Sequence, residues 1–141
     1  MIYLDTSAAV PLFVSEPSSA AVDLWYEGCA DTLVASDWIV TEFASALALK
    51  ERAGMLAAKD ARAAWREFEA FCDAGLRLLP LSRATFHDAA MLTRQHAHGL
   101  RAGDALHLAA ALELDVTSFA TLDLKQANNA RRMKLRTVEF F

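Results

Sequence analysis

Short runs of apolar residues alternate along the chain with longer stretches in which apolar residues recur every three or four positions. The short runs predict buried strands, and the longer stretches predict amphipathic helices. The predicted strands cover residues 2–4, 33–35, 76–80, 118–120 and 136–140. The predicted helices cover residues 19–27, 38–53, 57–72, 82–98, 104–114 and 125–133. Strands separated by helices need crossover connections, so we predict an α/β fold: one three-layer α/β/α domain over residues 1–141 with a central, mainly parallel sheet of about five strands.

Composition narrows the class of protein without naming a function. The chain has 141 residues, of which 55% are hydrophobic, and this excludes a disordered protein. Its net charge of −4 argues against indiscriminate binding of polyanions, although metal-binding carboxylates would give a nuclease the same sign. The two cysteines, Cys29 and Cys72, belong to no metal-binding pattern. Because neither a signal peptide nor a membrane-spanning run is visible, we expect a cytoplasmic protein that contacts no membrane.

Asp5 is the first candidate for chemistry, because it directly follows the predicted strand at residues 2–4. Open α/β sheets bind their ligands at the carboxyl ends of the strands, which is where Asp5 would lie. Aspartate is also a good N-cap, and the SAAV segment after Thr6 resembles the start of a helix. The fragment alone leaves both interpretations open.

Three other carboxylates are placed to join Asp5. Glu42 borders the apolar face of its helix, Asp104 lies in the first turn of an apolar helix, and Asp123 follows the fourth predicted strand. Each has a simpler role when taken alone, since Asp104 and Asp123 would suit helix N-termini and Glu42 would suit the edge of an amphipathic helix. In a parallel sheet, however, all four would converge on one cleft at the carboxyl edge.

Such a cluster predicts a bound cation. Two like charges about 4 Å apart repel by roughly 1 kcal/mol in water and about 4 kcal/mol at an effective dielectric constant of 20. Oxygen ligands without a cysteine or histidine set favour Mg²⁺ or Mn²⁺, and these ions suit phosphodiester hydrolysis. The hydroxyls of Thr6, Ser7 and Thr121 can hold metal-bound water or a substrate phosphate, although capping and turn formation would account for them equally well.

Four segments carry a resemblance to a known family. They are DTSAAVPLFVSEP, VTEFASAL, RAGDALHLAAAL and FATLDLKQANNARRMKLRTV, in this order. The chain resembles the PIN-domain ribonucleases and, more narrowly, the VapC toxins of type II toxin–antitoxin systems. The resemblance implies an endoribonuclease dependent on Mg²⁺ or Mn²⁺, a homodimer, and inhibition by a cognate VapB-like antitoxin whose tail lies across the active-site groove.

The resemblance also implies roles for individual residues. Asp5, Glu42, Asp104 and Asp123 would be the catalytic, metal-binding acids, and Ser7 would be the hydroxyl that accompanies them. One departure concerns the position after Asp123, where the family often has Arg or Lys and this chain has Leu124.

Basic residues near the acids are candidates for RNA binding. Arg101 and Lys125 would contact RNA phosphates together with Thr6 and Ser7, with solvated surface roles as the alternative. The densest basic stretch comprises Lys125, Arg131, Arg132, Lys134 and Arg136. We expect no catalytic histidine, and His107, flanked by leucines, is expected to be packed and hydrogen-bonded.

Other functions fit the sequence less well. A receiver domain would need an acidic pair after the first strand, where Asp5 is followed by Thr6 and Ser7. A haloacid dehalogenase-like phosphatase would need Asp at position 7, and no glycine-rich phosphate loop occurs. Two alternatives remain, namely an RNA-processing nuclease outside a toxin pair and a non-catalytic PIN-like binding module.

Overall fold

The sheet is parallel throughout and places the first strand of the chain at its centre. The computed structural model describes residues 1–141. The strands are β1 (Ile2–Leu4), β2 (Leu33–Ser36), β3 (Arg77–Leu79), β4 (Ser118–Ala120) and β5 (Arg136–Thr137). Their order is β3-β2-β1-β4-β5, and every neighbouring pair is parallel. This confirms the predicted sheet, and it places the ends of β1 and β4 side by side at one edge.

Seven α-helices connect or follow the strands. They are α1 (Thr6–Ala9), α2 (Ser19–Glu27), α3 (Trp38–Arg52), α4 (Ala58–Ala74), α5 (Arg83–Arg94), α6 (Ala102–Glu113) and α7 (Leu124–Arg132), with short 3-10 turns at Val10–Leu12 and His96–His98.

Three helix boundaries differ from the prediction by two residues or more, and one of them is the end of α4, which continues to Ala74 instead of ending at residue 72. Helix α6 begins two residues earlier, because the Asp104 carboxylate accepts from the backbone N–H of Arg101 and thereby caps the turn from within. Helix α5 stops at Arg94, where the chain turns through Gln95 into a 3-10 turn and reaches Gly99 in the left-handed conformation at φ +65°.

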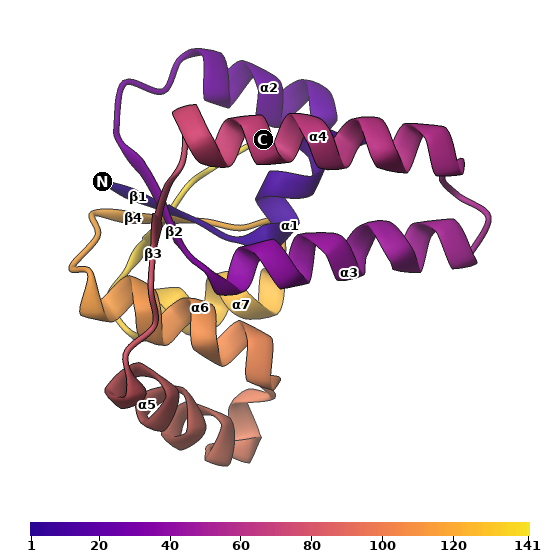
Figure 1. Cartoon of the computed structure of the whole chain (residues 1–141). Helices are drawn as coiled ribbons and strands as arrows, with labels where there is room; N and C mark the ends of the chain where they lie inside the picture. The colour runs from indigo at the N-terminus through magenta and orange to yellow at the C-terminus, as the bar shows by residue number, and fades with distance from the viewer.

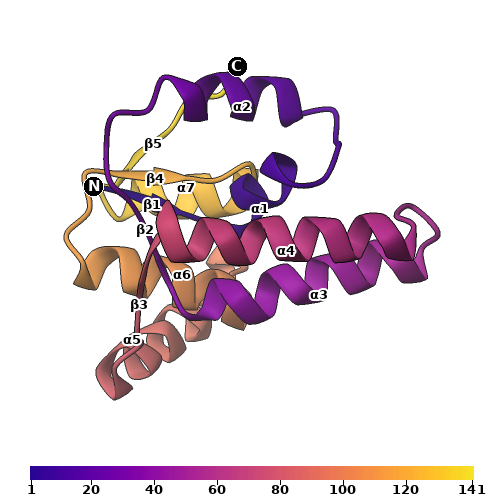
Figure 2. The same ribbon diagram turned by 45° about the horizontal axis from the view of Figure 1, so that its top comes forward.

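Helices cover both faces of the sheet, as Figures 1 and 2 show. On the face covered by α2, α3 and α4, the core is built around Phe43, which stacks on Phe68 with ring centroids 3.9 Å apart. On the other face, Tyr3 of β1 stacks on Phe119 of β4 and packs with the apolar side of α6. The predicted three layers are therefore present.

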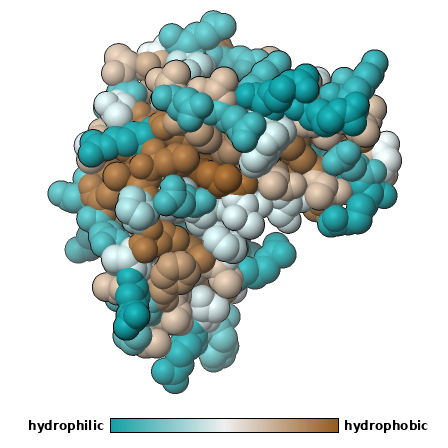
Figure 3. All heavy atoms as spheres, viewed as in Figure 1, coloured by the Kyte–Doolittle hydropathy of each residue, from teal (hydrophilic) through white to brown (hydrophobic).

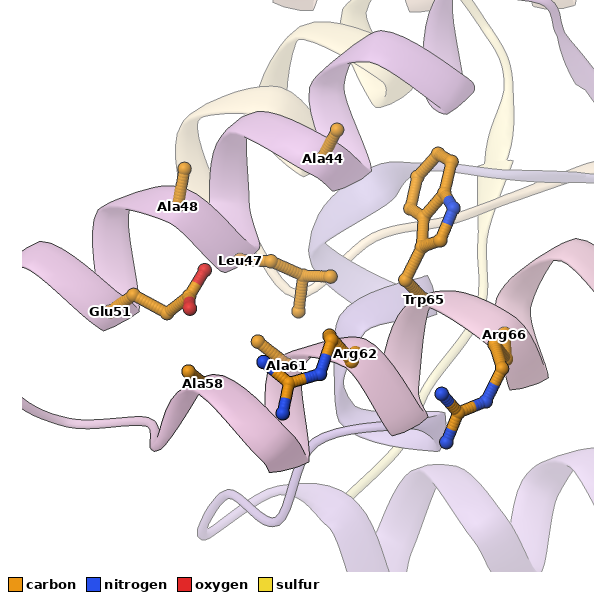
Figure 4. Close-up of a pocket in the computed structure, with 9 residues that line it drawn as sticks. All are labelled: Ala44, Leu47, Ala48, Glu51, Ala58, Ala61, Arg62, Trp65 and Arg66. Atoms are coloured by element: carbon orange, nitrogen blue, oxygen red, sulfur yellow. The ribbon is translucent and has the colours of Figure 1, made fainter.

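Helices α3 and α4 form a long hairpin that extends beyond the sheet (Figures 1 and 2). A groove of about 480 Å³ runs between them, with Leu47 and Trp65 among its apolar lining and Arg62 and Arg66 on α4 (Figure 4). Glu51 is the only acid that lines it, so this groove is not the predicted carboxylate cluster.

Apolar residues also reach the surface elsewhere. In the view of Figure 3 they lie over the β3 edge of the sheet and above α5. On α5, the side chains of Phe86 and Met91 are exposed. None of the helices has the length and apolar character needed to cross a membrane.

Candidate metal centre

Asp5 combines the two roles that its sequence context suggested. It ends β1 and caps α1, because its Oδ2 accepts from the backbone N–H of Ser7 at 3.3 Å. The same oxygen accepts from Ser7 Oγ at 2.6 Å and from Thr121 Oγ1 at 2.8 Å. Its other oxygen, Oδ1, lies 3.5 Å from His107 Nε2. One oxygen of this buried carboxylate is thus held by capping bonds, while the other faces the cluster.

Glu42 reaches the same place from α3. Its Oε2 accepts a hydrogen bond from the Thr6 hydroxyl and lies 2.5 Å from His107 Nε2. Burial acts to raise the pKa of Glu42, but hydrogen bonding and charge from His107, together with Thr6 and the Trp38 indole, outweigh it and lower the pKa. The carboxylate is therefore held ionised, which is the form that binds a cation.

His107 is the buried centre of this group. It lies on α6, three residues after Asp104, and its side chain is fully buried. Burial acts to lower its pKa, yet the hydrogen bond to Glu42 and the charges of Asp5, Glu42 and Asp104 raise it. One ligand atom each from Asp5, Glu42 and His107 lie within 4.8 Å of one another.

Asp104 and Asp123 approach the cluster from two helix N-termini. Asp104 lies in the first turn of α6, and Asp123 caps α7 by accepting from the backbone N–H groups of Lys125 and Gln126 at 2.8 and 3.1 Å. Burial raises the pKa of Asp104, the hydrogen bond from Arg101 opposes this, and the negative charges of Asp123 and Asp5 raise it further. Asp104 is thus repelled by Asp5 and by Asp123, although Asp104 and Asp123 lie outside the tighter group of Asp5, Glu42 and His107.

The predicted hydroxyl residues contact the acids directly, whereas the predicted basic residues form no salt bridge with them. Ser7 Oγ bonds Asp5 and lies 3.0 Å from Thr121 Oγ1, while Thr6 bonds Glu42. Arg101 precedes α6 and Lys125 lies in the first turn of α7, and neither forms a salt bridge.

The rest of the basic stretch is partly occupied within the molecule. Arg131 pairs with Glu139 at 3.3 Å, Arg132 donates to Asn129, and Arg136 donates to the carbonyl of Thr117. Arg101 and Lys125 are the basic residues nearest in sequence to Asp104 and Asp123, and no salt bridge neutralises their positive charge.

A hollow of about 510 Å³ opens at the molecular surface beside Asp123. Ser7 and Asp123 line it together with Leu122 and with Glu16 and Lys50, which pair with each other. Asp123 is the only one of the four acids that lines this hollow. The Glu42 side chain is itself 29% exposed, so the cluster is not sealed in the core.

The backbone at Gly103 lies directly against the Glu42 carboxylate. A Cβ atom at this position would lie 2.7 Å from Glu42 Oε1 and 3.1 Å from Trp38 Nε1. The backbone of α6 therefore approaches the Glu42 carboxylate closely because residue 103 has no side chain.

We expect Gly103→Ala to weaken Mn²⁺ binding about tenfold, because the methyl group displaces the Glu42 carboxylate. The fold should tolerate the change, since alanine is intrinsically better in a helix by about 1 kcal/mol and the contacted oxygen ends a flexible side chain. Mn²⁺ titration and thermal melting check this. Gly28→Ala is the control, because its Cβ would meet only ordinary contacts of 3.6 Å or more. Equal Mn²⁺ affinity in both variants would contradict the expectation.

Sequence reasoning did not find the hydrogen-bonded surroundings of the acids. His107 was expected to be packed and hydrogen-bonded, as it is, but its partners are Glu42, Thr6 and Tyr3. The signal in the sequence is a polar residue one turn after Asp104 in an otherwise apolar helix. That position faces the sheet rather than solvent, so its partner had to be another buried polar group.

The donor set fits a hard divalent cation. Asp5 after β1 and Glu42 on α3 offer carboxylate oxygens, the Asp104 carboxylate lies near them on α6, and no cysteine takes part. A soft metal would find neither thiolates nor several histidines here.

Comparisons with known proteins agree with this geometry. Residues 2–132 match the PIN domain family. Two curated proteins of Mycobacterium tuberculosis, Ribonuclease VapC45 and Ribonuclease VapC49, are each 35% identical to this chain over 112 residues, covering 79% of it and 75% of the relative. The chain therefore belongs to the PIN-domain family. Within that family its curated relatives are VapC ribonucleases, which confirms the family that the sequence resemblance indicated.

Solved structures show the same fold. The crystal structure of Mycobacterium tuberculosis VapC20, described as a sarcin-ricin loop cleaving toxin, aligns with a TM-score of 0.74 at 15% identity, covering 92% of this chain and 95% of that one. A toxin–antitoxin complex from Klebsiella pneumoniae aligns with a TM-score of 0.68 at 13% identity, covering 100% and 98% of the two chains.

Proposed function

We propose that this protein is an endoribonuclease that hydrolyses RNA phosphodiester bonds with Mg²⁺ or Mn²⁺ bound by Asp5, Glu42, Asp104 and Asp123. The observation that carries the proposal is the convergence of these carboxylates, which are remote in sequence, at one edge of the sheet, where Asp123 also lines an open hollow. When bound, such an ion supplies a Lewis acid and lowers the pKa of coordinated water.

The residues of the chain then have separate tasks. Ser7 and Thr121 hold Asp5 through one oxygen and leave the other directed at the cluster. Thr6 holds Glu42 by its hydroxyl. Arg101 and Lys125, which form no salt bridge, would bind RNA phosphates on either side of the bond to be cleaved. The names of the curated relatives support RNA as the substrate.

The partners follow from the same comparison. Because structural neighbours include toxin–antitoxin complexes, we include a cognate VapB-like antitoxin among the partners. A homodimer is supported by two exposed apolar residues, Met91 and Leu112, that line a hollow between α5 and α6. We place the protein in the cytoplasm, where RNA and antitoxin are both present.

Incubating the purified protein with total RNA and sequencing the new RNA ends tests the proposal. We expect discrete internal cleavage sites that disappear with a chelator and return when Mn²⁺ is added in excess. Cleavage that persists in chelator would exclude the metal-dependent mechanism. No cleavage with either ion, by a protein that binds them, would favour the non-catalytic PIN-like module.

A further inference from the structure

We propose that His107 is a positioning residue that fixes Glu42 and Asp5 in the arrangement that binds the divalent ion, and that His107 is not itself a ligand. The proposal rests on the metal site proposed above, and it assigns a task to a residue outside the carboxylate set. The observation behind it is a continuous line of hydrogen bonds from β2 through Tyr3 and His107 to Glu42, with Asp5 Oδ1 3.5 Å from the same ring nitrogen.

Both ring nitrogens of His107 are already engaged. Nε2 lies 2.5 Å from Glu42 Oε2, 3.1 Å from Thr6 Oγ1 and 3.5 Å from Asp5 Oδ1. Nδ1 lies 3.0 Å from the hydroxyl of Tyr3. A coordinating histidine needs a free lone pair on one nitrogen, and here each nitrogen is directed at a protein partner. Hard cations also prefer the oxygen atoms next to it.

The outer end of this line is anchored in the centre of the sheet. The hydroxyl of Tyr3 accepts from the backbone N–H of Ser36 at 3.2 Å and lies 3.0 Å from Ser36 Oγ. Tyr3 belongs to β1 and Ser36 to β2, which are neighbouring strands. The Tyr3 ring is buried, stacks on Phe119, and meets the His107 ring edge-on at 5.7 Å. The imidazole therefore has a fixed position and orientation.

Glu42, in contrast, needs to be fixed. Its side chain remains 29% exposed and has three rotatable bonds, whereas the His107 side chain is fully buried. A bond to an immobile imidazole selects one rotamer of the glutamate before the ion arrives. Partners of this kind around metal ligands contribute about 10–100-fold to metal affinity. Asp5 already has three capping contacts, so Glu42 should be the ligand that depends more on His107.

Three substitutions at His107 distinguish the role of Nε2, which faces Glu42, from that of Nδ1, which faces Tyr3. His107→Gln places an amide nitrogen near the position of Nε2 and can still donate to Glu42. His107→Asn reaches only as far as Nδ1, towards Tyr3, and His107→Ala removes both contacts. We expect Mn²⁺ dissociation constants, measured by electron paramagnetic resonance, to rise about 10–100-fold in the Asn and Ala variants. The Gln variant should bind Mn²⁺ more tightly than either.

Two further measurements distinguish positioning from ligation and from a purely structural role. Electron spin echo spectra of Mn²⁺ bound to the parent protein should show no ¹⁴N coupling from a histidine. Tyr3→Phe leaves His107 in place and removes its anchor, so Mn²⁺ affinity should fall in the same direction by a smaller factor. His87→Ala is the matched control, because this histidine is exposed on α5 and should leave Mn²⁺ affinity unchanged.

The outcomes separate this proposal from the proposed function. A histidine ¹⁴N coupling in the parent protein would make His107 a ligand and overturn the positioning role while leaving the metal site intact. Parent-like affinity in the folded Asn variant, or equal affinities in the Gln and Asn variants, would also overturn it. If the Ala variant does not fold, the Mn²⁺ affinities of the Gln and Asn variants, compared with each other, and that of Tyr3→Phe decide between the two outcomes. A parent protein that binds no Mn²⁺ would refute both proposals.

Discussion

Asp5→Asn should abolish measurable Mn²⁺ binding and lower the rate of RNA cleavage at least about a thousandfold, equivalent to about 4 kcal/mol of transition-state stabilisation. In the parent protein, Oδ2 is occupied by Ser7 and Thr121, and Oδ1 is the oxygen left for the ion. In the variant, the amide oxygen would take the position that accepts these capping bonds. The NH₂ group would then point at the cluster, where it donates and cannot coordinate a cation.

The same substitution should leave the fold intact, because asparagine is as good an N-cap as aspartate. Thermal melting without metal and initial rates of RNA cleavage check the two halves of the expectation. Asp23→Asn is the control, since Asp23 is exposed on α2 and makes none of the contacts in the site. A folded Asp5→Asn protein that cleaves RNA at the parent rate would refute the metal-nuclease mechanism.

Phe43→Ala should lower the free energy of unfolding by about 3–5 kcal/mol. Phe43 is fully buried next to Glu42 on α3, stacks on Phe68, and meets Phe13 edge-on with centroids 5.7 Å apart. Removing the ring leaves a cavity between α3 and α4, which the rigid sheet cannot fill. Because small domains are stable by only about 5–15 kcal/mol, the loss is a large fraction of the total.

Urea denaturation measures this change, which should appear as a lower midpoint with an unchanged slope. Phe86→Ala is the matched control, because Phe86 is 51% exposed on α5. Its free energy of unfolding should change by much less than that of Phe43→Ala. Similar losses in the two variants would mean that the stack of Phe43 on Phe68 does not stabilise the core.

The fold and the meeting of the acids could be predicted because they depend on periodicity and topology. A strand followed by Asp5, and a later strand followed by Asp123, must end at the same edge if the sheet is parallel. Asp104 was recognisable by its place in the first turn of an apolar helix. The two interpretations of Asp5, a helix N-cap and a ligand-binding carboxylate, are compatible, since one oxygen caps α1 and the other faces the cluster.

The contacts between the acids and their surroundings could not be predicted, because they depend on ångström-scale placement of elements. The pairing of His107 with Glu42 requires α3 and α6 to cross at one particular height. The approach of Gly103 to Glu42 depends on the same crossing, and a glycine within a helix does not by itself indicate a close contact. The sequence predicts only that Tyr3 belongs to an apolar strand. That its hydroxyl contacts Ser36 and His107 is visible only in the structure.

The central position of β1 has a consequence for synthesis of the protein. Asp5 leaves the ribosome long before Thr121 and Asp123, which reach it only when β4 pairs with β1. A nascent chain, or a fragment cut before residue 118, contains Asp5, Glu42 and Asp104 but lacks β4, which pairs with β1 in the finished sheet. The proposed nuclease centre would therefore be completed only after β4 has been made, and we expect unfinished chains to leave the RNA of the cell that makes them intact.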